Sequence, residues 1–258
     1  MSKELSDFNL KSIKVLKYLL ENNVVEDDII ETIRQLELDY YTLLNKFDYL
    51  EKRVHIDKKS GLLVYNEEYF YQILKTISRI YDAINKASSY NITYIRYDID
   101  DFSKINNLYG HEFGDIVIEH LGQIFLTTAR PTDYSIRFGG EEFDIILPGT
   151  GIKGAERFIS RIDKKIKKYR FDFAEKKIKI TLSAGVSSYD FPYKIIKNLN
   201  QKKVLKYFRI IQSQADDALY FSKNTGKNKA SFYNDKIKYK EIRKEYISKK
   251  LSKEKLWN

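Results

Sequence analysis

Residues 135–147 read SIRFGGEEFDIIL, two short runs rich in Ile and Phe that are separated by a pair of glycines and a pair of acids. Such runs are typical of strands, and Gly139-Gly140 supplies the tight turn of a β-hairpin. A glycine pair also lets the backbone approach a ligand closely, because no side chain intervenes. The stretch therefore predicts a hairpin that carries Glu141 and Glu142 beside its turn.

Strand and helix patterns alternate on both sides of this hairpin. Strands are expected at 92–98, 178–186 and 230–233, and helices at 114–128, 155–169 and 204–223. The alternation predicts a sheet covered by helices. Residues 187–203, which are rich in Lys and Asn, are interpreted as a surface insertion.

Carboxylates gather at the end of the first of these strands. Asp98 ends the strand, and Asp100 and Asp101 follow directly. If this strand neighbours the hairpin, two acidic groups converge at one end of the sheet, which is costly unless a cation neutralises them. Mg²⁺ prefers such oxygen ligands and completes its shell with waters and substrate phosphates. Either acidic group alone would instead indicate a solvated turn.

A second glycine-containing segment, Gly110 to Gly114, lies between Asn106 and Asp115. Both polar side chains could point from this region into one pocket. An aspartate carboxylate accepts two hydrogen bonds from the N1 and N2 edge of guanine, which adenine cannot supply. The segment therefore favours a guanine nucleotide as ligand.

Four motifs, in order, resemble those of the GGDEF diguanylate cyclases. Residues 98–107 (DIDDFSKINN) and 110–115 (GHEFGD) are similar to the family's DIDxFKxxND and GHxxGD motifs. Residues 139–143 match the signature in its GGEEF form, and 215–228 resemble the late ADxALYxAKxxGRN block. The resemblance covers about residues 57–234. It implies an α+β fold, a palm-like nucleotidyl-cyclase domain whose central, antiparallel-rich sheet is flanked by helices.

The resemblance also implies roles at a metal centre. Asp98 and the backbone carbonyl of Ile99 would bind Mg²⁺, with Mn²⁺ as an alternative, and Glu141 would join them. Glu141 would also help to deprotonate the ribose 3′-hydroxyl. Glu142 would be a second carboxylate at the centre, and Arg137 would lie near the phosphates.

The resemblance also implies which residues would bind the substrate GTP. Asn106 and Asp115 would read guanine, and an aspartate at the second position favours two guanines over a mixed product. Phe102 and its neighbours would bring backbone N–H groups to the phosphates, and His111 would lie near the ribose or phosphates. The β- and γ-phosphates would be held by Lys223 and Lys227.

Three departures from the family pattern affect these expectations. Ser103 stands where the family usually has a lysine, and a serine supplies no cation. Lys104 cannot simply take over, because one residue rotates about 100° around a helix. The opening motif, residues 57–66, is two residues longer than DxLTGLxN, and Asn107 replaces an aspartate. The change at Ser103 predicts a lower rate.

Five residues separate the tetrapeptide Arg130-Pro131-Thr132-Asp133 from Gly139. An RxxD string is common and usually carries no function, but this is the position of the family's product-inhibition site. Arginine can pair with phosphate through two hydrogen bonds and stack on a guanine. Cyclic di-GMP is therefore expected both as product and as inhibitor.

The flanking segments differ from this domain. Residues 1–56 indicate helices, and eight apolar positions recur at alternating spacings of four and three, as in a coiled coil: Ile29, Ile33, Leu36, Tyr40, Leu43, Phe47, Leu50 and Val54. The seam predicts a homodimer, although an amphipathic helix packed on its own domain is the alternative. Residues 235–258 carry nine Lys or Arg against four Asp or Glu and are interpreted as a basic tail, solvated or partly helical, with membrane binding left open.

Composition narrows the function classes. The net charge of +10 is consistent with nucleic-acid binding, but the lysines are spread along the chain, and no nucleic-acid partner is expected. There are no cysteines, which excludes disulfides and thiolate metal sites. No apolar run approaches the roughly 18 residues of a transmembrane helix, and the start of the sequence lacks a signal peptide, so a cytoplasmic location is expected.

The leading hypothesis is therefore an active diguanylate cyclase. The alternative is a weakly active or inactive receptor that binds cyclic di-GMP or GTP; Ser103 favours it, and the intact Glu141 and Glu142 count against it. A third hypothesis is a basic adaptor that works through residues 235–258.

Overall fold

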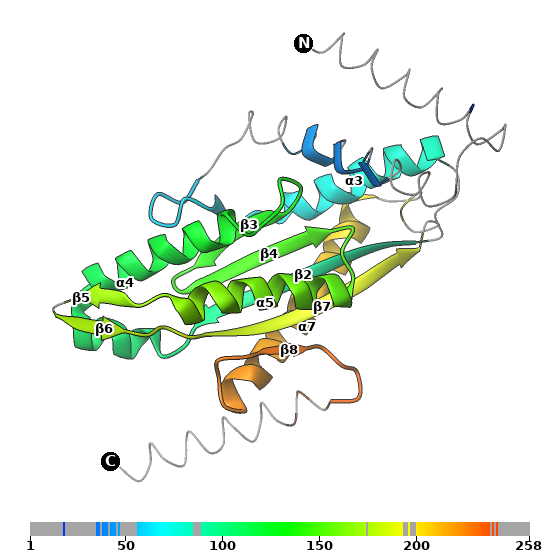
Figure 1. Cartoon of the computed structure of the whole chain (residues 1–258). Helices are drawn as coiled ribbons and strands as arrows, with labels where there is room; N and C mark the ends of the chain where they lie inside the picture. The colour runs from blue at the N-terminus through cyan, green and yellow to red at the C-terminus, as the bar shows by residue number, and fades with distance from the viewer. Residues whose placement is uncertain are drawn as a thin grey trace.

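The computed structural model describes residues 56–84, 89–173, 175–192 and 200–237, with positions 18, 35, 36, 38–40, 42–44, 46, 196, 239 and 241. A six-stranded sheet forms its centre, in the order β1-β3-β4-β2-β7-β8 (Figure 1). The strands are β1 (Leu63–Val64), β2 (Ser89–Ile99), β3 (Tyr134–Gly139), β4 (Glu142–Pro148), β7 (Leu182–Pro192) and β8 (Ala230–Phe232). The three inner pairs are antiparallel, and the two outer pairs are parallel. The expected antiparallel-rich central sheet is confirmed.

Helices cover both faces of this sheet. The α4 helix (Phe102–Leu126) and the α5 helix (Ile152–Lys168) pack on one face, and α3 (Glu68–Ile84) and α7 (Gln201–Asn224) pack on the other. Successive side chains of a strand point to opposite faces. On β2, Ile95 and Tyr97 accordingly join the core beneath α4 and α5, whereas Ile92 and Tyr94 join the core beneath α3 and α7. A separate hairpin, β5 (Phe171–Phe173) with β6 (Lys176–Ile178), packs at the α4 and α5 face.

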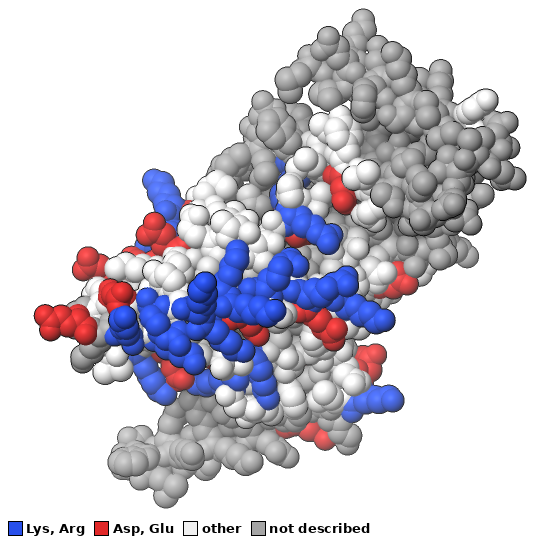
Figure 2. Space-filling view, viewed as in Figure 1, with Lys and Arg blue, Asp and Glu red and all other residues white. Residues whose placement is uncertain are grey.

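The outer face of α5 is basic. Figure 2 shows lysine and arginine side chains gathered over this helix. Its apolar positions, among them Ala155, Phe158 and Ile162, are buried against the sheet. The helical period therefore leaves the intervening lysines and arginines on the solvent side.

The register of β2 and β4 brings the acidic motifs together. Asp98 lies directly opposite Glu142, and Tyr97 lies opposite Phe143. The expected β-hairpin is confirmed as β3 and β4, with a register shift between Arg137 and Gly139. The carboxylates of two motifs that are 43 or more residues apart in the chain thus meet at one end of the sheet.

Three sequence expectations need correction. The helix expected at 114–128 begins at Phe102 and is kinked at Gly110, where φ is 85° and ψ is 161°. The strand expected at 178–186 is β7, so residues 187–192 are strand and not surface insertion, since they pair with β2 as far as Ser89. The third correction is α3, a helix that no pattern indicated.

The flanking segments are described only in part. Of the predicted heptad seam, Leu36, Tyr40 and Leu43 are described, and the other five positions lie outside the described residues. Tyr239, in the predicted basic tail, is 4% exposed and stacks on Tyr233, so the tail begins packed on the domain. Within the part of the chain that the structure describes, no helix combines the length and apolar character of a membrane span.

Candidate active site

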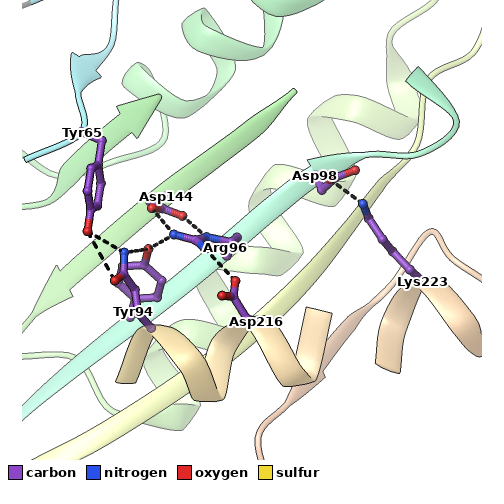
Figure 3. Close-up of polar contacts among 8 residues, drawn as sticks. Tyr65, Tyr94, Arg96, Asp98, Asp144, Asp216 and Lys223 are labelled. Carbon is purple, nitrogen blue, oxygen red and sulfur yellow. Dashed lines mark hydrogen bonds and ion pairs between the residues drawn. The ribbon is translucent and has the colours of Figure 1, made fainter. Parts of the chain in front are cut away.

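Asp98 and Lys223 form an ion pair at the end of β2. The Nζ atom of Lys223, from the last turn of α7, lies 2.5 Å from Oδ2 of Asp98 (Figure 3). The Asp98 side chain is 5% exposed. Burial raises its pKa; Lys223 opposes this, and Glu141 and Asp100 add to the rise, so that the pKa stays above its ordinary value. A buried carboxylate of this kind needs a cation, and Lys223 supplies one.

The turn of the hairpin is fixed by Arg137. Its Nε and Nη2 atoms donate to the carbonyl of Gly140 at 3.3 and 2.8 Å, and its Nη1 atom donates to Oδ1 of Asp57 at 2.8 Å. Gly140 has φ of +51°, a conformation that favours glycine. The backbone N–H of Ile99 donates to the carbonyl of Glu141 at 3.3 Å, which holds the turn against the end of β2.

The donor set around Asp98 suits a hard divalent cation. Glu141 and Glu142 both interact electrostatically with Asp98. Burial raises the pKa of Glu142; Arg96 opposes this and Asp98 adds to it. Among the described residues, no three carboxylate or histidine side chains are grouped closely enough to hold a metal alone. The predicted ligands, which are the carboxylates of Asp98 and Glu141 and the backbone carbonyl of Ile99, are a suitable set for Mg²⁺. Mg²⁺ usually completes its shell with waters and phosphates.

Asp100 and Asp101 belong to the supporting structure around the site. Asp100 accepts hydrogen bonds from the hydroxyls of Thr181 and Ser183 at 2.7 and 2.6 Å and from the backbone N–H of Asn228 at 2.9 Å. It therefore ties the end of β2 to β7 and to the loop after α7. Asp101 forms an ion pair with Lys227 at 2.8 Å, so Lys227, a predicted phosphate ligand, lies at the start of α4.

The predicted guanine-reading residues are close together on α4. Oδ1 of Asn106 faces Gly114 so closely that a Cβ atom on Gly114 would lie 2.1 Å from it. This oxygen is buried and has no hydrogen-bond partner among the residues that the structure describes. Asp115 follows Gly114, and both of its carboxylate oxygens are bound by Lys59 Nζ, at 2.6 and 2.7 Å. His111 is exposed between them, and Phe102 is buried where the helix begins.

The sequence model of the family described as "Diguanylate cyclase, GGDEF domain" matches residues 54–229. The chain belongs to this family. Among curated relatives, "Diguanylate cyclase A" of Treponema denticola is 34% identical over 166 residues, which cover 64% of this chain and 41% of the relative. "Diguanylate cyclase DgcM" of Escherichia coli is 32% identical over 180 residues, 70% of this chain and 38% of the relative. The chain thus spans less than half the length of these relatives.

Solved structures share the fold. The active GGEEF domain of a diguanylate cyclase from Vibrio cholerae is 26% identical, with a TM-score of 0.51, and the match covers 67% of this chain and 99% of that domain. The coiled coil and GGDEF domain of DgcB from Caulobacter crescentus, in complex with c-di-GMP, gives a TM-score of 0.55 at 20% identity. That match covers 83% of this chain and 99% of the other.

A buried arginine in this GGDEF domain, Arg96, was not predicted from the sequence. Arg96 Nε and Nη2 donate to the two oxygens of Asp144 at 2.7 and 2.8 Å, and Nη1 donates to Asp216 at 2.7 Å (Figure 3). Its Nη2 atom also donates to the Tyr94 hydroxyl, and the guanidinium lies 3.8 Å from the centroid of the Phe138 ring. Because Arg96 is two residues before Asp98, both face α7, and the network supports the strand end that carries Asp98. The sequence signal that could have identified Arg96 is the alternation of polar with apolar residues at the end of β2, which is otherwise mostly apolar.

The RxxD turn of the GGDEF domain is tied to the N-terminal segment. Oδ2 of Asp133 accepts from the backbone N–H of Arg130 at 2.7 Å, and Asp133 is 3% exposed. Burial raises the pKa of Asp133. Lys46 donates to the carbonyls of Pro131, at 2.9 Å, and Asp133. The Arg130 side chain is exposed, so the two predicted inhibitory residues face different surroundings.

Proposed function

We propose that this chain condenses two GTP molecules into cyclic di-GMP and pyrophosphate. The observation that carries the proposal is the meeting of three motifs at the end of β2. Asp98 lies opposite Glu142 of the hairpin and is neutralised by Lys223 of α7. A sheet end that carries carboxylates and a lysine suits phosphoryl transfer, in which positioning and charge stabilisation supply most of the rate.

Asp98, the Ile99 carbonyl and Glu141 would hold Mg²⁺, with Mn²⁺ as an alternative. When bound, this ion would lower the negative charge on the α-phosphate and the leaving pyrophosphate. Glu141 would accept the proton of the 3′-hydroxyl, and Glu142 would be the second carboxylate of the centre. Each 3′-oxygen forms a bond to the α-phosphorus of the other nucleotide, while the bond from that phosphorus to the bridging oxygen breaks and pyrophosphate leaves.

Lys223 and Lys227 would bind the β- and γ-phosphates. In the structure each lysine pairs with a carboxylate, Asp98 or Asp101. Each therefore stands beside the site with its charge balanced and can exchange that carboxylate for a phosphate. Backbone N–H groups near Phe102 would add donors, and Arg137 would act near the phosphates while holding the hairpin turn.

Asn106 and Asp115 would read guanine. Their positions on one helix support this, because Asn106 packs closely on Gly114, the residue that precedes Asp115. His111, exposed on the same helix, would lie near the ribose or phosphates. Two guanine nucleotides are favoured, since a carboxylate at Asp115 matches the N1 and N2 donors of guanine.

The reaction needs two such sites face to face and thus a homodimer. Leu36 and Leu43 are seven residues apart in the predicted seam, and they are 63% and 42% exposed in a single chain. Burying two leucines of one heptad position against a second copy would stabilise the dimer. The exposed Arg130, with Asp133 beside it in sequence, would bind cyclic di-GMP as inhibitor.

Incubation of the purified chain with GTP and Mg²⁺, followed by chromatography, tests the proposal. We expect cyclic di-GMP from the wild type, none from Glu141→Gln, and normal yield from Glu156→Gln, an exposed acid on α5. A confirmed dimer that binds GTP but forms no product would instead support the receptor alternative.

A further inference from the structure

The ion pair between Lys59 and Asp115 adds little to the stability of the fold. Lys59 and Asp115 side chains are 54% and 46% exposed. Exposed pairs of this kind contribute little, because solvent screens the two charges. A ligand can therefore open the pair at small cost.

The backbone that carries Lys59 is held firmly, in contrast with its side chain. Oδ1 of Asp57 accepts from the backbone N–H and the hydroxyl of Ser60, both at 2.8 Å, and from Arg137. The carbonyl of Ser60 packs against α4 so tightly that a Cβ atom on Gly122 would lie 2.0 Å from it. The turn is thus fixed on the same helix that carries Asp115, whereas the Lys59 side chain is exposed to solvent.

We propose that Lys59 is a second base-reading residue, which donates to O6 of guanine while Asp115 accepts from N1–H and N2–H. The proposal rests on the function proposed above, because it takes Asp115 as a guanine ligand. In the structure Lys59 occupies both Asp115 oxygens, the atoms that the base would need. A bound guanine displaces the ammonium from these oxygens, and the neighbouring O6 is the acceptor left within its reach.

The pair presents the hydrogen-bonding pattern that complements guanine. Asp115 offers two acceptors, Lys59 offers a donor, and the guanine edge offers two donors and an acceptor in the same order. Adenine would place its N6 donor against the ammonium and its N1 acceptor against the carboxylate. Two mismatches of this kind reject the wrong base more strongly than the loss of one contact.

The test compares the affinities of three nucleotides by calorimetric titration in Mg²⁺. The full chain carries Glu141→Gln to prevent turnover. The nucleotides are GTP, 6-thio-GTP, in which sulfur replaces O6, and ITP, which lacks the N2 amine. Lys59→Met is compared with Lys58→Met, which alters the exposed neighbouring lysine of the same turn.

We expect GTP to bind roughly ten- to a hundredfold more tightly than 6-thio-GTP, as for one hydrogen bond to a charged group. Lys59→Met should abolish this preference and keep the preference for GTP over ITP, whereas Lys58→Met should keep both. An unchanged preference for GTP over 6-thio-GTP in Lys59→Met would overturn the proposal. So would an equal gain in affinity for all three nucleotides, which would make Lys59 a competitor only. In both cases turnover of GTP by the wild type would leave the cyclase proposal standing, whereas absence of both GTP binding and GTP turnover in the wild type would overturn both.

Discussion

Lys223 Nζ lies 2.5 Å from Asp98 Oδ2, so the residue expected to bind phosphate neutralises the residue expected to bind metal. The two lie on different elements, α7 and β2. Before nucleotide arrives, the pair keeps a buried carboxylate from standing alone. Exchange of partners, lysine to phosphate and aspartate to divalent ion, would then couple nucleotide binding to assembly of the metal site.

Lys223→Met should destabilise the fold at pH 7 by about 1–3 kcal/mol, because it leaves Asp98 buried without a partner. Burial already raises the pKa of Asp98, and loss of Lys223 raises it further. Protonation removes the unpaired charge, so the loss is present at neutral pH and shrinks as the pH falls towards the ordinary pKa of about 4. Urea unfolding at pH 7 and pH 4 measures the difference in the free energy of unfolding between the wild type and Lys223→Met.

The matched control for this change is Lys164→Met on the exposed face of α5, which should match the wild type at both pH values. Mg²⁺ should recover part of the stability of Lys223→Met, since it restores a cation beside Asp98. Equal losses at pH 7 and pH 4 would show that the cost is one of packing and not of charge.

Arg96→Met should cost about 3–5 kcal/mol, because it strands the fully buried Asp144. Arg96→Met combined with Asp144→Leu should recover much of this loss, since neither charge then remains buried. Arg209→Met is the control: that arginine pairs with Glu67 on the surface and is 67% exposed. Denaturant unfolding of the wild type, both single variants (Arg96→Met and Asp144→Leu), the double variant and the control measures these free energies. Additive losses in the double variant would contradict the pairing.

Local patterns predicted the hairpin, because turn chemistry and strand alternation act over a few residues. The meeting of its acids with Asp98 was expected only if the two strands were neighbours, which the family resemblance implied. The Arg96 network could not be predicted in this way, since Asp144 and Asp216 are 48 and 120 residues away and only the fold brings them together. The pairing of Lys59 with Asp115 has the same cause. The start of α4 was missed because the polar residues Ser103, Lys104, Asn106 and Asn107 and the kink at Gly110 interrupt the apolar period.

Gly114→Ala should weaken GTP binding by roughly tenfold, at a cost of about 1 kcal/mol in stability. The new methyl group would lie 2.1 Å from Oδ1 of Asn106 and 3.0 Å from Cζ of Phe102, so the Asn106 side chain must rotate away and the Phe102 ring must shift slightly. A lost polar contact to a base costs about this factor. KM and calorimetry measure it, and Gly151→Ala, where the nearest atom would be 3.4 Å away, is the control. A higher KM in both variants would point to a general effect.

Lys46 predicts a pH dependence of its own. Burial lowers the pKa of Lys46 to about 8, although Asp133 acts in the opposite direction. Between pH 8 and the ordinary value near 10.5, the unfolded chain binds more protons than the folded one, so stability rises with pH in this window. Unfolding of the wild type and Lys46→Met at pH 7.5 and pH 10 isolates the effect. We expect the wild type to gain relative to the variant at pH 10, and a constant difference would contradict the burial of this ammonium.

Ser103→Lys should raise the turnover number by up to about tenfold while leaving KM nearly unchanged. Ser103 is exposed on the first turn of α4, and the adjacent Lys104 is held at 2.7 Å by Asp101, so it does not supply the missing cation. A lysine at 103 would stabilise charge that builds on the phosphates in the transition state, which raises kcat and not ground-state affinity. Ser160→Lys, an equal charge change on the exposed face of α5, controls for attraction of GTP by net charge. A lower KM in both variants with no change in kcat would show that position 103 acts at long range only.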